Sequence, residues 1–160
     1  MSDEYDFSIN VPVRNDWSNV SLLVTSVQNC FNAMFANVKE SRTVAIVTGE
    51  LLENAIKYGS WTKSDQRLHL RVSGSHELTR ITVDNPTTPE SFAELQKTLD
   101  WMAGFPDAEA AFRARLLAIA TTNDPNVSKL GVVRICYQGR CSIVAKRVND
   151  VAFVTAELKL

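Results

Sequence analysis

Residues 50–59 read Glu-Leu-Leu-Glu-Asn-Ala-Ile-Lys-Tyr-Gly, and this stretch says more about the fold than any other. Spacings of four and then three residues place Glu50, Asn54 and Lys57 on one stripe of an otherwise apolar helix. Polar groups on a buried helix face are costly unless they contact one another or a ligand. Gly59 is a residue type that often follows the end of a helix. A carboxylate and an amide one turn apart predict a site for hydrated Mg²⁺ and a nucleotide phosphate. Taken alone, such a stripe is more often a solvated helix face or a cap network.

The composition is that of an ordinary globular protein. The chain has 160 residues, of which 45% are hydrophobic, and this predicts a single domain over residues 1–160. A net charge of -1 does not indicate a nucleic-acid-binding surface, and no apolar run approaches the roughly 20 residues that cross a membrane. Three cysteines without the spacing of a disulfide framework indicate a cytoplasmic protein. Cys30 and Cys136 fall on apolar helix faces and are expected in the core.

Hydrophobic periodicity predicts alternating blocks of strand and helix. A period of two indicates strands, and a period near 3.6 indicates helices. Asn85 to Pro89 contains two prolines and predicts a break in both kinds of structure. Strands are expected at 7–13, 68–72, 79–83, 141–146 and 151–158, and helices at 20–35, 41–59, 90–120 (interrupted at 104–106) and 128–137.

This order of elements predicts an α/β (α+β) two-layer sandwich. The strands come in hairpins and are separated by blocks of helix rather than by single crossover helices. Such an arrangement favours a mixed, largely antiparallel sheet with helices on one face. It argues against a doubly wound parallel fold.

Two further segments are candidates for a shared site. Asp84 ends a predicted strand, where a carboxylate can accept a hydrogen bond from an exocyclic amine such as that of adenine. The alternative is that Asp84 opens a turn by bonding its own backbone. Residues 128–131, Ser-Lys-Leu-Gly, start a helix, and free N–H groups, a lysine and a glycine are a plausible phosphate cradle. The alternative there is an ordinary helix start capped by Ser128.

Together these segments resemble the histidine-kinase-like (GHKL) ATPases, and more narrowly the small bacterial anti-sigma-factor serine kinases of partner-switching systems. In that family an N-terminal strand and a long helix precede a Glu-x-x-x-Asn-Ala motif, which residues 50–55 match. An adenine-binding aspartate opens the family's next motif, and Asp84 stands at that place. A helical lid, a phosphate loop, a helix and two strands follow, with residues 129–132 at the loop position. The resemblance in element order covers nearly the whole chain.

The resemblance implies a Bergerat-type (GHKL) ATPase fold in which residues 85–127 form a helical lid-like insertion. It implies ATP and Mg²⁺ as cofactors, with Glu50 as the general base, Asn54 as the Mg²⁺ ligand and Asp84 as the adenine contact. For Lys57, an interaction with the helix dipole is an equal alternative to a phosphate contact. The remaining cofactor contacts implied around the phosphates are Lys57, Ser128, Lys129, Leu130 and Gly131.

The chain departs from the family pattern at its glycines. The family's first glycine motif reads Asp-x-Gly-x-Gly, whereas residues 84–88 read Asp-Asn-Pro-Thr-Thr, and Lys129 replaces the first glycine of the phosphate loop. Side chains at such positions obstruct the close approach of the backbone to phosphates. Two functions therefore stay open. One is an ATP-binding regulator of the anti-sigma type that phosphorylates a serine or threonine of a partner. The other is a non-catalytic protein-binding module on the same fold.

The partner implied by the resemblance is a protein, either a sigma factor or an antagonist of the anti-sigma factor. A homodimer is compatible with both functions. A weaker alternative is an unrelated enzyme that uses Glu50 and Lys57 as an acid–base pair, but no nucleophile or cofactor motif supports it.

Overall fold

The computed structural model describes residues 3–12, 20–35, 37–75, 77–122 and 130–159 of the chain. In these ranges five strands and five helices follow one another in the order that the hydrophobic periodicity predicts. The strands are β1 Tyr5–Pro12, β2 Arg67–Gly74, β3 Leu78–Pro86, β4 Cys141–Val148 and β5 Val151–Lys159. The helices are α1 Val20–Phe35, α2 Val38–Tyr58, α3 Pro89–Ala103, α4 Ala108–Thr121 and α5 Gly131–Gly139.

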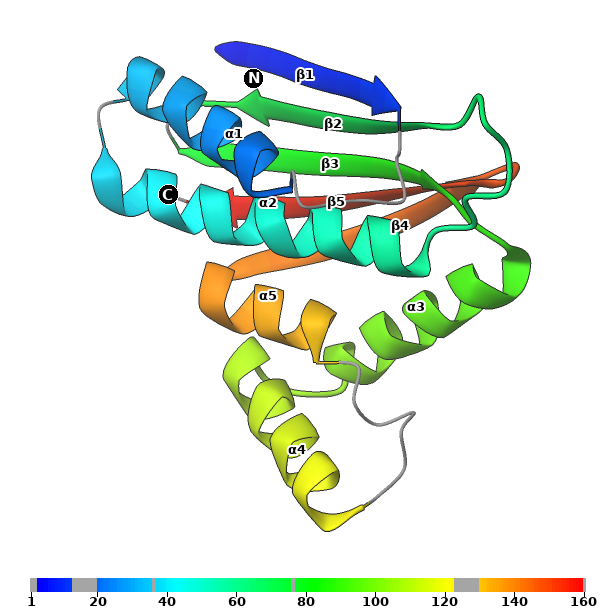
Figure 1. Cartoon of the computed structure of the whole chain (residues 1–160). Coiled ribbons are helices and arrows are strands. Elements are labelled where there is room, and N and C mark those ends of the chain that lie inside the picture. Colours follow the sequence, from blue (N-terminus) through cyan, green and yellow to red (C-terminus); the bar gives the residue numbers. More distant parts are fainter. Residues whose placement is uncertain (1–2, 13–19, 36, 76, 123–129, 160) are drawn as a thin grey trace.

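The strands form one sheet in the order β1-β2-β3-β5-β4, and every described pair is antiparallel. Helices α1, α2 and α5 lie across one face of this sheet, while α4 projects away from it (Figure 1). The predicted two-layer α+β architecture is therefore confirmed. The sheet is antiparallel throughout the described strands, because hairpins join β2 to β3 and β4 to β5, and β5 lies between β3 and β4.

Alternation along the strands decides which side chains meet the helices. In β3 the odd-numbered residues from Thr79 to Asn85 are buried, and the even-numbered ones up to Asp84 are partly exposed. The buried residues of the sheet pack against the apolar stripes of α1, α2 and α5 and form one core. Its largest members are Phe31, Leu52, Leu68, Leu70, Ile81, Ile135 and Leu158.

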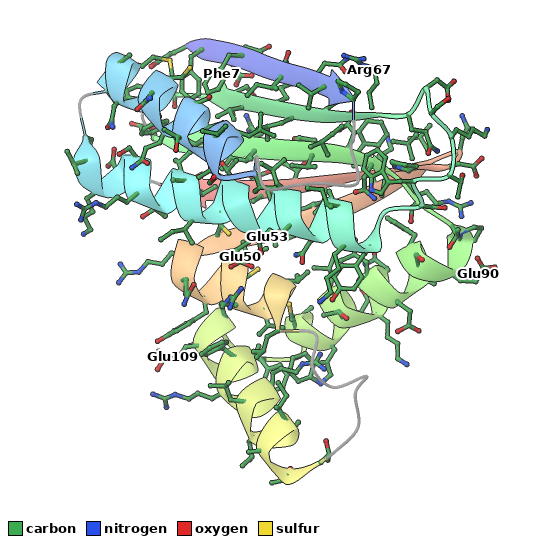
Figure 2. The ribbon with its side chains drawn as sticks, viewed as in Figure 1. Phe7, Glu50, Glu53, Arg67, Glu90 and Glu109 are labelled. Atoms are coloured by element: carbon green, nitrogen blue, oxygen red, sulfur yellow. The ribbon has the colours of Figure 1, made fainter. Side chains whose placement is uncertain are left out.

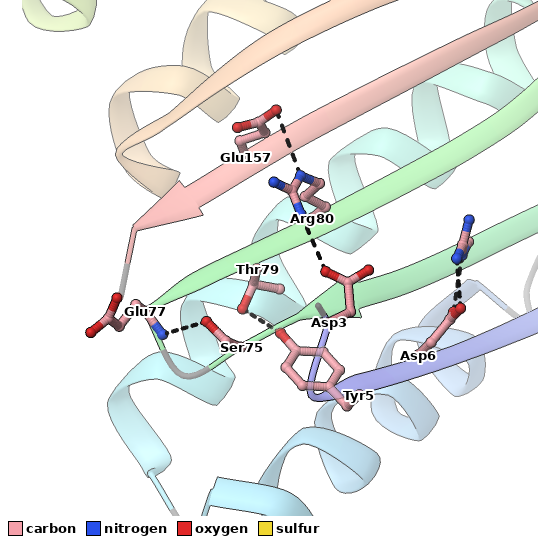
Figure 3. A network of polar contacts seen from close by, with 9 residues as sticks. Asp3, Tyr5, Asp6, Ser75, Glu77, Thr79, Arg80 and Glu157 are labelled. Atoms are coloured by element: carbon pink, nitrogen blue, oxygen red, sulfur yellow. Dashed lines mark hydrogen bonds and ion pairs between the residues drawn. The ribbon is translucent and has the colours of Figure 1, made fainter. Parts of the chain in front are cut away.

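No helix among the described residues covers the other face of the sheet, which is largely polar. Figure 3 shows Arg80 between two carboxylates, with Nη1 3.4 Å from Asp3 Oδ1 and Nε 3.8 Å from Glu157 Oε1. On the neighbouring strands, Arg71 Nη2 lies 2.6 Å from Asp6 Oδ2. These pairs cross β1, β2, β3 and β5, and because they are exposed to water they contribute little to stability.

Helix α2 begins earlier than its sequence predicts. Asn37 is the N-cap, with its side-chain oxygen accepting a hydrogen bond from Glu40 N at 3.1 Å. Ser41, the expected cap, is instead fully buried within the helix, where its hydroxyl donates to the Val38 carbonyl. An asparagine caps as well as a serine, so residue type alone did not separate the two positions.

The expected break at residues 85–89 is also narrower than predicted. Asn85 and Pro86 still belong to β3 and pair with β5. A proline is tolerated at the last position of a strand, and the Pro86 carbonyl accepts a hydrogen bond from Ser60 N at 2.8 Å. Thr88 then caps α3, and Pro89 takes the first helical position, where its missing N–H costs nothing.

The helical segment predicted at residues 90–120 is present as α3 and α4. Helix α4 packs against α5, where the Phe112 and Tyr137 rings stack with centroids 4.7 Å apart. The lid-like insertion at residues 85–127 stays a prediction, since residues 85–86 lie in β3 and residues 123–127 are outside the described ranges.

We expect Leu52→Ala to lower the free energy of unfolding by about 2–5 kcal/mol, because Leu52 is fully buried and the truncation leaves a cavity. Leu22→Ala is the matched control, since Leu22 is also helical but 64% exposed and should change stability by about 0.5 kcal/mol or less. Urea unfolding followed by circular dichroism measures both. Equal losses in the two variants would contradict this core.

Candidate functional site

A cavity of about 190 Å³ lies where the end of α2, the ends of β3 and β5, the start of α3 and the first turn of α5 meet. Most of its walls are apolar, from side chains such as Leu51, Val83, Phe92, Leu95 and Val154. A few polar groups converge among them, as is typical of a small-molecule site. These polar side chains are Asn54, Asn85, Thr87, Ser91, Glu94 and Thr98.

Asn54 and Gly131 meet at this cavity, as the sequence analysis expects of two residues of one site. A Cβ atom on residue 131 would lie only 2.9 Å from Asn54 Oδ1 and 3.1 Å from its Nδ2. A side chain at residue 131 would therefore have to displace the amide of Asn54 from its present position. The contact sets the first turn of α5 directly against α2.

Asn85 is one of the polar residues of the cavity that the sequence analysis missed. Its side chain is 8% exposed and lines the cavity. Its Nδ2 donates to the Pro86 carbonyl at 3.0 Å, so the amide oxygen is the atom left to accept a hydrogen bond from a ligand. The alternation of side chains along β3 identifies Asn85 as an inward residue. Ile81 and Val83 face inward, and Asn85 follows at the same two-residue period.

Asp84, by the same alternation, lies on the helix-free face of the sheet. Its Oδ2 is 3.1 Å from His69 Nδ1 on β2. The side chains of His69 and Asp84 are 38% and 19% exposed. The structure therefore does not bring Asp84 together with Asn54 and Gly131, and the turn-opening alternative does not describe it either, because Asp84 lies within β3.

Glu50 contacts a residue that the sequence analysis did not consider. Its Oε1 lies 2.5 Å from Nη2 of Arg134, which is one turn into α5, and Figure 2 shows Glu50 on the side of α2 that faces α5. The carboxylate raises the pKa of Arg134, chiefly through this hydrogen bond. Arg134 Nε is also buried, and it has no hydrogen-bond partner among the described residues. The position of Arg134 one turn after Gly131 was the available signal.

The remaining predicted contacts are less central. Lys57 is exposed in the last turn of α2, with Nζ 5.2 Å from the Tyr58 ring centroid. Leu130 precedes α5 without a side-chain cap, and its carbonyl accepts from Arg134 N at 2.7 Å. The predictions for Ser128, including its role as helix cap, and for Lys129 lie outside the described residues.

The described ranges hold no group of three or more His, Cys, Asp or Glu side chains that could bind a metal ion by themselves. Mg²⁺ needs no such group when a nucleotide is present, because it is usually held by one or two protein oxygens together with substrate phosphates. The half-buried amide oxygen of Asn54 suits that role. In the same ranges, no helix combines the length and the hydrophobicity needed to cross a lipid bilayer.

Comparison with known proteins supports the fold. No family model matches the chain, and no curated protein matches its sequence. Among solved structures, a chain of the crystal structure of the SiaB–SiaC complex from Pseudomonas aeruginosa matches with a TM-score of 0.68. The match covers 96% of this chain and 89% of that chain, at 17% sequence identity. At this identity the likeness establishes the shared fold and nothing finer.

The Glu50–Arg134 pair predicts a measurable coupling between α2 and α5. We expect a double-mutant cycle of Glu50→Gln and Arg134→Gln to give a coupling energy of about 0.5–1 kcal/mol, limited by the 40% exposure of Arg134. The control is Glu109 with Arg113, an ion pair whose side chains are 50% and 76% exposed and which should couple by about 0.5 kcal/mol or less. A coupling near zero for the first pair, measured by urea unfolding, would show that Glu50 is free of Arg134 in solution.

Proposed function

We propose that this chain is an ATP-binding regulatory protein of the anti-sigma-factor type, which acts on a protein partner in bacterial partner-switching signalling. The observation that carries the proposal is the cavity in which Asn54, Asn85 and Gly131 meet. These residues come from three segments far apart in the sequence, and they converge at the ends of a helix, a strand and a following helix.

The cavity suits the base of a nucleotide. Sites for drug-sized ligands measure about 300–1,000 Å³, so a cavity of about 190 Å³ holds a flat ring system rather than a whole nucleotide. Asn85 supplies the hydrogen-bond acceptor that an exocyclic amine such as that of adenine requires. Apolar side chains such as Leu51 and Val83 provide the surroundings that a planar ring prefers.

The phosphates belong at the start of α5 in this proposal. The first backbone N–H groups of a helix have no partner within it and attract anions. Gly131 lies against Asn54, so a Mg²⁺ ion held by the Asn54 amide oxygen would meet phosphates placed there. When bound, the metal ion would supply charge neutralisation for the phosphates.

A protein partner is part of the proposal. The structural neighbour was crystallised as a complex of two proteins, SiaB and SiaC. Partner switching, implied by the resemblance to anti-sigma-factor kinases, likewise works through protein contacts.

A second candidate is the non-catalytic binding module on the same fold, and one observation favours it. Glu50, the expected general base, is hydrogen-bonded to a guanidinium group. A substrate hydroxyl would have to compete with the Arg134 guanidinium for this carboxylate oxygen. Experiments must therefore distinguish ATP binding with phosphoryl transfer from ATP binding without it.

Isothermal titration with ATP and Mg²⁺ tests binding and distinguishes two neighbouring residues. We expect binding by the wild-type protein and an affinity about tenfold lower or weaker still in Asn85→Leu, because the hydrogen bond to the base is lost. Asp84→Asn is the matched control, since Asp84 lies on the helix-free face and should change the affinity by less than about twofold.

The opposite ranking of these two variants would favour Asp84 as the adenine contact that the resemblance implies. Absence of heat from the wild-type protein at high micromolar concentration would contradict nucleotide binding and favour the binding module. Circular dichroism of both variants separates a loss of affinity from a loss of folding.

Phosphoryl transfer from labelled ATP to a co-purified partner tests the role of Glu50. If Glu50 is the general base, Glu50→Gln should slow transfer by about 10²–10⁴-fold while leaving the affinity for ATP nearly unchanged. Glu53→Gln is the control, because Glu53 is exposed on the same helix. Equal transfer rates in Glu50→Gln and the wild-type protein would exclude this role.

A further inference from the structure

Two of the three cysteines meet at the junction of α5 and β4. Helix α5 ends at Gly139, and Arg140 then adopts a left-handed conformation with φ 48° and ψ 44°. The Arg140 N–H bonds to the Cys136 carbonyl, so the chain reverses within one turn. Cys136 and Cys141 are therefore the two positions that such a helix end brings into contact.

The two thiols lie near enough to influence each other, and both line one cavity. Cys141 Sγ lies 3.5 Å from the Ile135 carbonyl oxygen, to which its thiol donates. Interaction with the Cys141 side chain lowers the pKa of Cys136, although burial opposes this shift. The same interaction, together with burial, raises the pKa of Cys141. Cys136 is thus the more acidic thiol, and its thiolate would be stabilised by its neighbour.

Both sulfur-bearing residues line a second cavity, and this cavity offers a path for a small reagent. It measures about 270 Å³ and lies between α3, α4, α5 and β4. Its other walls include Leu99, Met102 and Phe105. Cys136 is only 5% exposed overall, so this cavity is where a small molecule would reach it.

We propose that Cys136 and Cys141 form a peroxide-reactive pair that closes to an intramolecular disulfide. The Cys136 thiolate attacks one oxygen of hydrogen peroxide, the O–O bond breaks, and the hydroxide that leaves takes a proton to become water. Cys141 sulfur then attacks the resulting sulfenic sulfur, the S–O bond breaks, and a second water leaves. In sum, two thiols and one peroxide become one disulfide and two waters.

Cys30 provides an internal control. It was expected in the core, but it is exposed on α1, whose buried residues are Val27 and Phe31. Exposure alone makes Cys30 open to alkylation, whereas closing a disulfide needs the contact that only Cys136 and Cys141 have among the described cysteines.

The sequence makes the test direct, because Arg140 lies between the two cysteines. Trypsin cleaves after Arg134, Arg140 and Lys146, which puts the cysteines on separate peptides, 135–140 and 141–146. After treatment of the folded protein with hydrogen peroxide, alkylation of free thiols and digestion, we expect these peptides to appear as one cross-linked species that dithiothreitol separates. Cys30→Ser should give the same species, and Cys141→Ser should abolish it.

Cross-linking in the native protein at limiting peroxide would support the pair, provided that circular dichroism shows it folded. Alkylated or over-oxidised Cys136 without the cross-linked species would overturn the proposal. So would a cross-link that forms only in urea, or one that joins two chains and disappears in Cys30→Ser. None of these outcomes depends on whether the chain binds ATP.

Discussion

The close contact between Asn54 and Gly131 is the constraint on which the cavity depends. Asn54 is near the end of α2 and Gly131 is the first residue of α5, and the amide of one occupies the space of the missing side chain of the other. Core residues fix α2 on the sheet, and Val133 and Ile135, both fully buried, fix α5. With both helices anchored in this way, the first turn of α5 lies beside the ends of β3 and α2. The cavity is thus a consequence of packing, and its polar groups are held by elements that the core makes rigid.

Apart from Glu94, the polar side chains of the cavity are neutral amides and hydroxyls, and this sets what they can recognise. Asn54 and Asn85 present amide groups, whereas the carboxylate of Glu50 is engaged by Arg134 and that of Asp84 by His69 on the far face of the sheet. Amides recognise a base by hydrogen bonds without adding negative charge beside a phosphate. The ion pair between Glu50 and Arg134 also joins α2 to α5 next to the Asn54 contact. The same arrangement can therefore hold a nucleotide while Arg134 occupies the carboxylate of Glu50, the expected general base. For this reason ATP binding and phosphoryl transfer are separate questions.

Most of the fold followed from the sequence, because hydrophobic periodicity records which residues face the core. The order of the strands and helices and the inward residues of β5, such as Ala152 and Ala156, were predictable in this way. The start of α2 was not, because Asn37 and Ser41 are both competent caps and only packing buries Ser41.

At the site, the meeting of Asn54 with Gly131 was expected. Asp84 was selected because a motif was matched by residue type, although the two-residue period of β3 points to Asn85 as the inward residue. Arg134 was missed because its place one turn after Gly131 was the only signal, and the sequence does not say which residue of another helix it contacts.

A crystal structure with a non-hydrolysable ATP analogue and Mg²⁺ bears most directly on the proposed site. The geometry predicts electron density for the base in the cavity beside Asn85 and for the phosphates at the first turn of α5, next to Asn54 and Gly131. Density for the analogue on the helix-free face beside Asp84 and His69, or a cavity that stays empty at saturating analogue, would contradict it.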